Sequence, residues 1–567
     1  MLPESVSAGN ALSIDMILNY YESLKTAKTF LRDLLIREGK TKTVTCLITD
    51  GLMKFTLDVG EETGVPVIYF RTASACSFWA YFCADRVIEA GECPFKDDMD
   101  LPIRSIPGME GFLRQRDLPS IHVTYLITVQ NHSRLLQNTD IVSRYAKYPG
   151  FRFQMLPENV SHGNAQPIKI FLQLYESLKT VQPFLRDVLV GRGQARPVTC
   201  LITDGLMKFT LDVGEETRVP VVYFRTASAA SFWAYFCSDK IVEGGECPFE
   251  GDDMDFPVRS VPGMEGFLRQ RDLPSPFRVP DINDTSSFYK IMSVETQQTV
   301  RARALILNTF QDLEKPIISQ LSTQIPNIYT FGPLHAHLKA RMDVETTSSM
   351  MGSSSSLWEE NRSCIKWLDE QPLKSVIYVS FGSLATVTKE QLMEFWFGLV
   401  NSGQRFLWVI RLDSVADNDG EQEFPAELEE GRKARGYTVN WAPQEEVLAH
   451  PAVGGFLTHS GWNSTLESIY EGVPMICWPY ATDQQINSRF VGEVWKLGLD
   501  IKDTCDKFII EKAVRDLMGA RKEEFAKSAK EMASLARKAV NEGGDCHHNL
   551  NKLIKDIKMM NVNAHHA

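Results

Sequence analysis

The chain has 567 residues and a formal net charge of −12, with 44% hydrophobic and 23% charged residues. This composition is ordinary for a soluble globular protein and excludes a disordered, collagenous or coiled-coil chain. Basic residues do not cluster, so we expect no nucleic-acid partner and no anionic-membrane surface. No apolar run is long enough to span a bilayer, and the first residues do not resemble a signal peptide. We therefore expect a cytoplasmic protein without a membrane span.

The 11 cysteines point to neither a disulfide framework nor a metal centre. None of them forms a CxxC pair, and no Cys/His cluster has the spacing of a zinc site. We expect reduced thiols, most of them buried, and no bound metal.

Apolar runs alternate with amphipathic segments along the chain, which predicts an α/β protein with parallel, doubly wound sheets. One strand is expected to end at Asp50, and the next lies at Val65–Phe70. Residues 122–128 and 151–156 predict two more strands, with a helix over 131–146 between them. Later strands are expected at 198–204, 219–224, 304–310, 327–333, 375–383, 406–411, 437–443, 454–461 and 475–480.

Two long segments of the sequence are copies of each other. Residues Met1–Ser120 recur as Met155–Ser275, and the run VTCLITDGLMKFTLDVGEET stands unchanged at Val44–Thr63 and at Val198–Thr217. Solenoid repeats are units of about 20–50 residues that stack many times. A longer unit that occurs twice indicates a duplicated gene segment instead.

A stretch rich in Ser, Thr and Gly at Met342–Ser356 predicts a linker between two α/β units. The predicted organisation is a duplicated partial N-terminal segment (1–120), an N-terminal domain (121–341), a linker (342–362), a C-terminal domain (363–545), and a C-terminal helix and tail (546–567).

The densest signal for a ligand site lies in the C-terminal domain, between Trp441 and Gln484. Within it, GGFLTH predicts a strand and SGWNSTLESI opens a helix. The free N–H groups of a helix N-terminus favour a phosphate, and His459, Asn463 and Ser464 add side-chain donors there.

Other residues of the segment suit the rest of a nucleotide sugar. Trp441 offers a flat face for a base, Glu467 can accept hydrogen bonds from ribose hydroxyls, and Asp483 and Gln484 can bind sugar hydroxyls. Taken singly, each has a structural explanation, such as a helix cap, a core aromatic or a loop carboxylate. Their combination in one continuous segment favours a nucleotide-diphosphate site.

The segment 441–484 resembles, without a gap, the signature box of plant UDP-dependent glycosyltransferases (glycosyltransferase family 1), and the resemblance extends over Ile121–Lys555. It implies the GT-B fold, in which two Rossmann-like doubly wound domains face a cleft, here with an incomplete and partly duplicated N-terminal domain that binds the acceptor. It also implies UDP-glucose as co-substrate and no cofactor. The runs YFRTASA, GMEGFLRQRDLPS and NHSRLLQ are most similar to the iridoid branch, of the 7-deoxyloganetic acid type.

The family pattern assigns roles to individual residues of this chain. Trp441 would stack on uracil, with the Ala442 backbone at the base edge. A final glutamine in the box, here Gln484, is associated with glucose as the donor sugar. The remaining implied contacts are with ribose (Gln444, Glu467), with the diphosphate (Ser383, His459, Asn463, Ser464) and with the sugar (Trp462, Asp483, Gln484).

The resemblance implies transfer with inversion, which needs a base to deprotonate an acceptor hydroxyl, and histidine is suited to this role. Asp204 and its copy Asp50 match the family's orienting aspartate. The family's GH-x-x-(P/S)-M turn, which carries the catalytic histidine, is not found around any of the 11 histidines. Three candidate substitutes, His122, His132 and His162, stand in the wrong context for a base.

The chain enters the family pattern at its second strand, at Ile121, so the first strand and helix are missing before it. In a doubly wound sheet that strand is central, and its loss leaves backbone groups without partners. The strand that ends at Asp50 has the length and apolarity to occupy the position of this first strand in the sheet.

The sequence thus predicts a monomeric UDP-glucosyltransferase that acts on a hydroxyl or carboxyl of a small plant metabolite, iridoid, terpenoid or phenolic. One alternative is a catalytically impaired UDP-sugar-binding protein from a rearranged or mis-joined tandem gene. Another alternative is a nicotinamide-dependent enzyme. The sequence argues against it, because no G-x-G-x-x-G motif follows any predicted strand.

Overall fold

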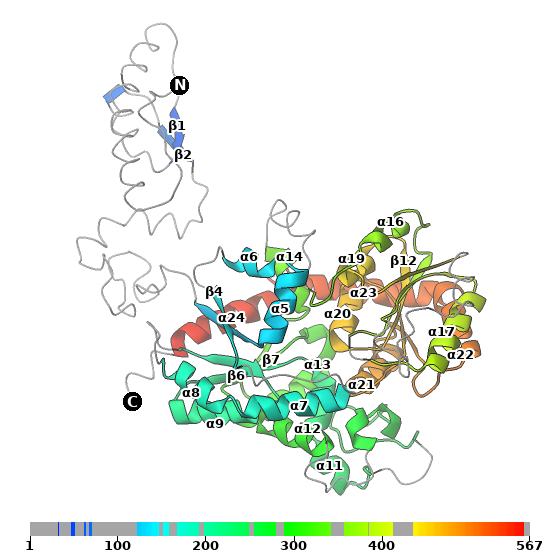
Figure 1. Ribbon diagram of the computed structural model, residues 1–567, viewed down its shortest axis with the longest axis horizontal. Helices are drawn as coiled ribbons and strands as arrows, with labels where there is room; N and C mark the ends of the chain where they lie inside the picture. Colours follow the sequence, from blue (N-terminus) through cyan, green and yellow to red (C-terminus); the bar gives the residue numbers. More distant parts are fainter. Residues whose placement is uncertain are drawn as a thin grey trace. The chain divides into compact units, whose positions relative to one another are not determined.

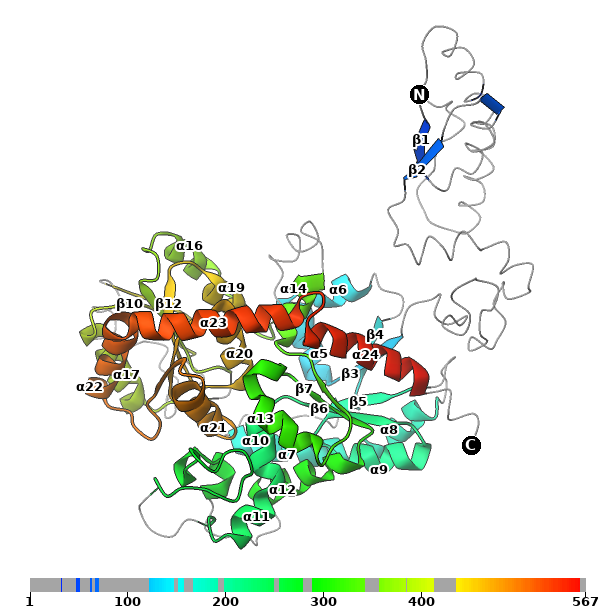
Figure 2. The same cartoon turned by 180° about the vertical axis from the view of Figure 1, so that it is seen from behind.

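The computed structural model describes residues 32, 47–50, 62–63, 67–70, 122–146, 151–157, 167–191, 198–248, 254–278, 288–341, 356–383, 385–411 and 435–560. The chain divides into two compact units, Met1–Val123 and Thr124–Ala567. Figures 1 and 2 show the arrangement of elements within the larger unit from two sides.

In the first unit, β1 (Leu47–Asp50) pairs in parallel with β2 (Val67–Phe70) in a two-stranded sheet. Asp50 lies opposite Phe70, just as Asp204 lies opposite Phe224 in the second copy of the repeat. The repeated sequence therefore forms the same strand pair twice. Whether the strand ending at Asp50 also completes the sheet of the second copy stays a prediction.

The C-terminal domain contains a six-stranded parallel sheet with the order β11–β10–β9–β12–β13–β14. This is the doubly wound order, which reverses direction between β9 and β12. Its strands are β9 (Val376–Ser380), β10 (Arg405–Val409), β11 (Gly436–Val439), β12 (Val453–Thr458), β13 (Met475–Cys477) and β14 (Gly498–Asp500). Only β14 was not predicted, because its three residues form no apolar run.

Helices cover both faces of this sheet (Figure 1). They are α16 (Ser363–Asp369), α17 (Lys389–Asn401), α19 (Gln444–Ala449), α20 (Trp462–Glu471), α21 (Gln484–Arg489), α22 (Lys507–Arg515) and α23 (Lys522–Val540). Ile377 and Val379 of β9 pack in one core with residues of α17 and α22, whereas Val376 and Tyr378 pack in another with residues of α20 and α23. The alternation follows from the two-residue period of a strand.

The N-terminal domain of the larger unit holds a parallel sheet with the order β5–β6–β7–β8, and β3 and β4 form a separate two-stranded sheet. The strands are β3 (Val123–Ile127), β4 (Phe151–Met155), β5 (Leu201–Asp204), β6 (Val221–Arg225), β7 (Ala304–Leu307) and β8 (Ile328–Thr330). The helices are α5 (Val129–Asn138), α6 (Ile141–Ala146), α7 (Pro167–Lys179), α8 (Gln182–Leu189), α9 (Lys208–Thr217), α10 (Ala229–Phe236), α11 (Ser238–Glu243), α12 (Phe288–Gln297), α13 (Gln311–Ser322) and α14 (Leu334–Arg341).

Among the described strands, β5 has a hydrogen-bonded neighbour on one side only. Its Ile202 is 49% exposed, and Tyr125 of β3 is 52% exposed, whereas Val222 of β6 is fully buried. The free side of β5 is the position at which the family pattern would place the missing first strand.

One predicted helix is divided in the structure. Residues 131–146 were expected to form a single helix, but α5 ends before Thr139 and α6 begins at Ile141. Thr139 has extended backbone angles, and both its N–H and its Oγ1 donate to the carbonyl of Leu135. The same Oγ1 accepts from the N–H of Ile141. Because this side chain satisfies the helix end, it competes with helix continuation.

The C-terminal helix α24 (Asp545–Met560) returns to the N-terminal domain (Figure 2). There Asn549 Nδ2 donates to the carbonyl of Thr330 at 3.0 Å, and Tyr329 donates to Asp556. None of the described helices has the length and apolarity needed to cross a membrane.

Candidate functional site

The carboxyl ends of β9 and β12 meet where the strand order of the C-terminal sheet reverses. Ser380 lies opposite Thr458 there. The next residues bring Gly382 against the ring of His459, so close that a Cβ on Gly382 would lie 2.6 Å from the imidazole. Gly382 has φ +73°, a conformation that favours glycine. Ser383, which the family pattern assigns to the diphosphate, follows in the same turn.

The imidazole of His459 is neutral at physiological pH. Burial lowers its pKa to about 4, against the opposing effect of a hydrogen bond with the Ser380 backbone. Its Nδ1 atom is buried and has no hydrogen-bond partner in the described part of the chain. An unsatisfied buried ring nitrogen calls for a partner, such as a ligand.

Helix α20 begins directly beside this histidine. A Cβ on Gly461, the N-cap residue, would lie 2.5 Å from His459 Nε2, and no side chain caps the helix. Asn463 is exposed in the first turn. The uncapped N–H groups and the positive end of the helix dipole together form an arrangement suited to a phosphate.

Gln444 contacts two other residues that the sequence assigns to the nucleotide, Ser464 and Glu467. Its Nε2 donates to Ser464 Oγ at 2.9 Å and to Glu467 Oε2 at 2.6 Å. Its Oε1 accepts from the hydroxyl of Tyr378 at 3.3 Å. The structure therefore brings together the predicted ribose residues, Gln444 and Glu467, and one predicted diphosphate residue.

Trp441 follows β11 and stacks on Trp358, with ring centroids 4.8 Å apart and an angle of 30° between the rings. Its carbonyl accepts from the N–H of Asn361 at 2.9 Å. Ala442, next in the chain, is buried. Trp358 lies in the segment predicted as a linker, and the sequence pattern gave no reason to connect it with the base site.

Asp483 and Gln484 lie at the start of α21. The Asp483 carboxylate accepts from Thr482 Oγ1 and Asn487 Nδ2, each at 2.9 Å. Burial raises its pKa against these hydrogen bonds. Gln484 Oε1 accepts from the backbone N–H groups of Tyr480 and Ala481. Two of the three predicted sugar residues, Asp483 and Gln484, are thus fixed within one tight turn.

Trp462 joins the two domains. It is buried, and its indole N–H donates to the carbonyl of Asn308, at 2.7 Å, in the loop after β7. The side chain of Asn308 in turn donates to Asn463 Oδ1 at 3.3 Å. The indole N–H of Trp462 is therefore used between the domains, a contact that no local sequence pattern could indicate.

The predicted orienting residue, Asp204, ends β5 and accepts from the N–H of Leu206 at 2.9 Å. Burial raises its pKa, while the charge of Arg225 and this hydrogen bond oppose the rise. Arg225 ends the neighbouring strand β6, is 2% exposed, and its Nε has no partner in the described part of the chain. Its charge also opposes the rise that burial causes in the pKa of Asp483.

Sequence reasoning missed Arg225, although a charged residue at the end of the apolar run VPVVYFR was a usable signal. No histidine of the described residues is in hydrogen-bond or ion-pair contact with Asp204. His132, one of the three candidate substitutes, lies in α5 with its ring against Phe153. The described residues also contain no cluster of His, Cys, Asp and Glu that could hold a metal ion.

Comparison with known proteins places this geometry in a family. A model for "UDP-glucoronosyl and UDP-glucosyl transferase" matches residues 351–533. A 7-deoxyloganetic acid glucosyltransferase of Catharanthus roseus is 52% identical over 449 residues, covering 78% of this chain and 92% of its own. A 7-deoxyloganetin glucosyltransferase of Gardenia jasminoides is 39% identical, covering 76% and 91%.

Among solved structures, that of UGT71G1 of Medicago truncatula complexed with UDP-glucose superimposes with a TM-score of 0.63 and 29% identity, covering 77% of this chain and 91% of that one. The architecture is therefore GT-B, with Rossmann-like domains built on parallel sheets. The chain belongs to the UDP-glycosyltransferase family.

Proposed function

We propose that this protein transfers glucose from UDP-glucose, with inversion, to a hydroxyl or carboxyl group of a small plant metabolite of iridoid, terpenoid or phenolic type. The observation that carries the proposal is the donor site: an unpartnered buried nitrogen of His459 beside the uncapped start of α20, at the point where the strand order reverses. The names of the relatives, glucosyltransferases for 7-deoxyloganetic acid and 7-deoxyloganetin, support both donor and acceptor class.

In this proposal each part of the donor has its own residues. Uracil stacks on Trp441, whose other face is backed by Trp358, and the Ala442 backbone meets the base edge. Ribose is held by Gln444 and Glu467. The diphosphate is bound by Ser383, His459, Asn463 and Ser464, and the glucose by Asp483, Gln484 and the ring of Trp462.

The reaction is a single displacement at the anomeric carbon of glucose. The acceptor oxygen forms a bond to this carbon from one side while the bond to the diphosphate oxygen breaks on the other, which inverts the configuration. UDP leaves with the electron pair, and the N–H groups at the start of α20 stabilise its charge. An acceptor hydroxyl must also pass its proton to a base or to water, whereas a carboxyl group is already ionised at neutral pH and has no proton to pass.

One observation favours a second function, UDP-sugar binding without transfer. Asp204 makes no contact with a histidine among the described residues, although the family pattern pairs it with one. This second function predicts that UDP-glucose binds normally and that no glucose reaches an acceptor hydroxyl.

An assay with UDP-[¹⁴C]glucose and two acceptors, one alcohol and one carboxylic acid, tests both functions. Label transferred to either acceptor above the level of a His459→Ala control supports the first. Binding of UDP-glucose in calorimetry, without transfer to either, supports the second. Absence of both binding and transfer would refute both.

A further inference from the structure

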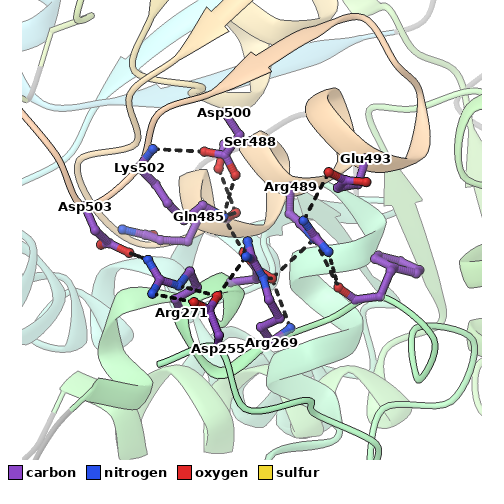
Figure 3. Close-up of polar contacts among 12 residues, drawn as sticks. Asp255, Arg269, Arg271, Gln485, Ser488, Arg489, Glu493, Asp500, Lys502 and Asp503 are labelled. Carbon is purple, nitrogen blue, oxygen red and sulfur yellow. Dashed lines mark hydrogen bonds and ion pairs between the residues drawn. The ribbon is translucent and has the colours of Figure 1, made fainter. Parts of the chain in front are cut away.

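A buried ion-pair cluster connects the N-terminal domain to α21 and β14 of the C-terminal domain. Asp272 is completely buried, and its carboxylate lies 2.6 Å from Lys502 Nζ, 2.9 Å from Arg269 Nε and 3.4 Å from Arg489 Nε. Figure 3 shows Arg269 on the N-terminal side of this contact, and Lys502 and Arg489 on the C-terminal side. The two domains thus share one set of charges.

The cluster keeps Asp272 ionised. Burial alone would raise the pKa of this carboxyl, but hydrogen bonds from Arg269 and the charge of Lys502 outweigh burial and lower it. The side chain of Lys502 is 4% exposed and also contacts Asp500 at 3.0 Å. Desolvation offsets much of the attraction in a buried ion pair, so the net stability that the cluster contributes is small.

Lys502 connects this cluster to the sugar turn. Its Nζ donates to the carbonyl of Gln485 at 2.9 Å. Gln485 lies in the first turn of α21, whose N-cap is Asp483 and whose first residue is Gln484. Asp483 and Gln484 are two of the three residues proposed to bind glucose, so the position of Lys502 affects the position of both.

A second contact holds the other end of the same turn. Thr482 has φ +56°, which is rare for a β-branched residue and costs free energy. Its N–H donates to Ser275 Oγ at 2.8 Å, and its carbonyl accepts from the N–H of Ser275 at 3.3 Å. The N-terminal domain therefore holds the strained residue that immediately precedes Asp483.

We propose that Asp272, Lys502 and Ser275 are positioning residues for the glucose unit of the donor. The N-terminal segment 263–278 holds α21 through Lys502 and the strained Thr482 through Ser275, and so fixes Asp483 and Gln484 where the sugar binds. The inference rests on the proposed function, since it takes UDP-glucose as the ligand. The uracil and diphosphate residues lie outside α21 and the turn before it, so we expect the three residues to act on the sugar more than on UDP.

Calorimetric titration with UDP-glucose and with UDP separates these two parts of the donor. Asp272→Asn is expected to weaken UDP-glucose binding about tenfold and to change UDP binding less than about twofold. Ser275→Ala, a milder change, is expected to weaken UDP-glucose binding about threefold with UDP again unaffected. The control Glu216→Gln removes an exposed carboxylate of the same domain, paired with Arg186 at 2.6 Å, and should alter neither ligand.

Circular dichroism and thermal melting check that each variant folds. If Asp272→Asn does not fold, the binding data of Ser275→Ala alone test the positioning role. An equal loss of UDP and UDP-glucose binding, or unchanged binding of UDP-glucose, would overturn the positioning role. A wild-type chain that binds neither ligand would overturn it as well. Because the readout is binding, a wild-type chain that binds UDP-glucose without transferring it would refute the proposed transferase and leave this test intact.

Discussion

The contact between Gly382 and His459 makes a sharp prediction about UDP binding. In Gly382→Ala, the new Cβ would lie 2.6 Å from the imidazole, which real Cβ contacts do not reach, and the neighbouring atoms belong to a side chain packed beside the start of α20. The ring must therefore move. The substitution also places alanine at φ +73°, which costs about 1 kcal/mol.

A matched control separates the displacement of the His459 ring from the cost of the strained backbone. Gly245 has φ +68°, and a Cβ added there would meet no atom within 4 Å, so Gly245→Ala carries the backbone cost alone. If His459 binds the diphosphate as proposed, displacing it removes a hydrogen bond to a charged group, worth about 1.5–3 kcal/mol. We expect Gly382→Ala to bind UDP about 10- to 100-fold more weakly than wild type, and Gly245→Ala to bind it normally.

Calorimetry with UDP measures the affinities, and differential scanning fluorimetry measures the stability of both variants. Both should lose similar stability from the strained backbone. If folded Gly382→Ala binds UDP as the wild type does, then His459 does not contact the diphosphate, and the assignment of the site to this strand reversal is wrong.

Three further predictions concern other parts of the larger unit. Folding lowers the pKa of His459 from 6.5 to about 4, so the unfolded chain takes up a proton first and the protein loses stability as pH drops through that window. In denaturant titrations, His459→Gln should therefore lose about 1–2 kcal/mol less stability than wild type between pH 7 and 4.5. An equal loss in both proteins would contradict this. Ile202→Thr, at a half-exposed position of β5, should cost less than about 0.5 kcal/mol, and Val222→Thr on buried β6 more than about 1 kcal/mol; equal costs would mean that the side chain of Ile202 is covered. Trp441→Ala should weaken UDP and UDP-glucose by the same factor of about tenfold, since both contain uracil, and unequal weakening in calorimetry would count against its role at the base.

Local sequence patterns were sufficient to predict those features of the structure that depend on residues close together in the chain. The runs of apolar residues predicted the strands β5 to β13, since most of these strands are buried and a buried strand is apolar over its whole length. The box from Trp441 to Gln484 likewise predicted that Gln444, Ser464 and Glu467 belong to one site, and the structure brings them into hydrogen-bond contact. The helix over 131–146 was wrong in detail, because a single side chain, Thr139, ends it.

The 567-residue sequence by itself determined the family and the doubly wound sheet and predicted a set of donor residues, since each rests on a pattern within one continuous segment. Only the tertiary structure decided which groups meet across the domains. Asp272 and Lys502 stand 230 positions apart in the chain, and Trp462 reaches a carbonyl 154 positions away. Periodicity describes which face a residue occupies along its own element, and it carries no information about the element that packs against that face.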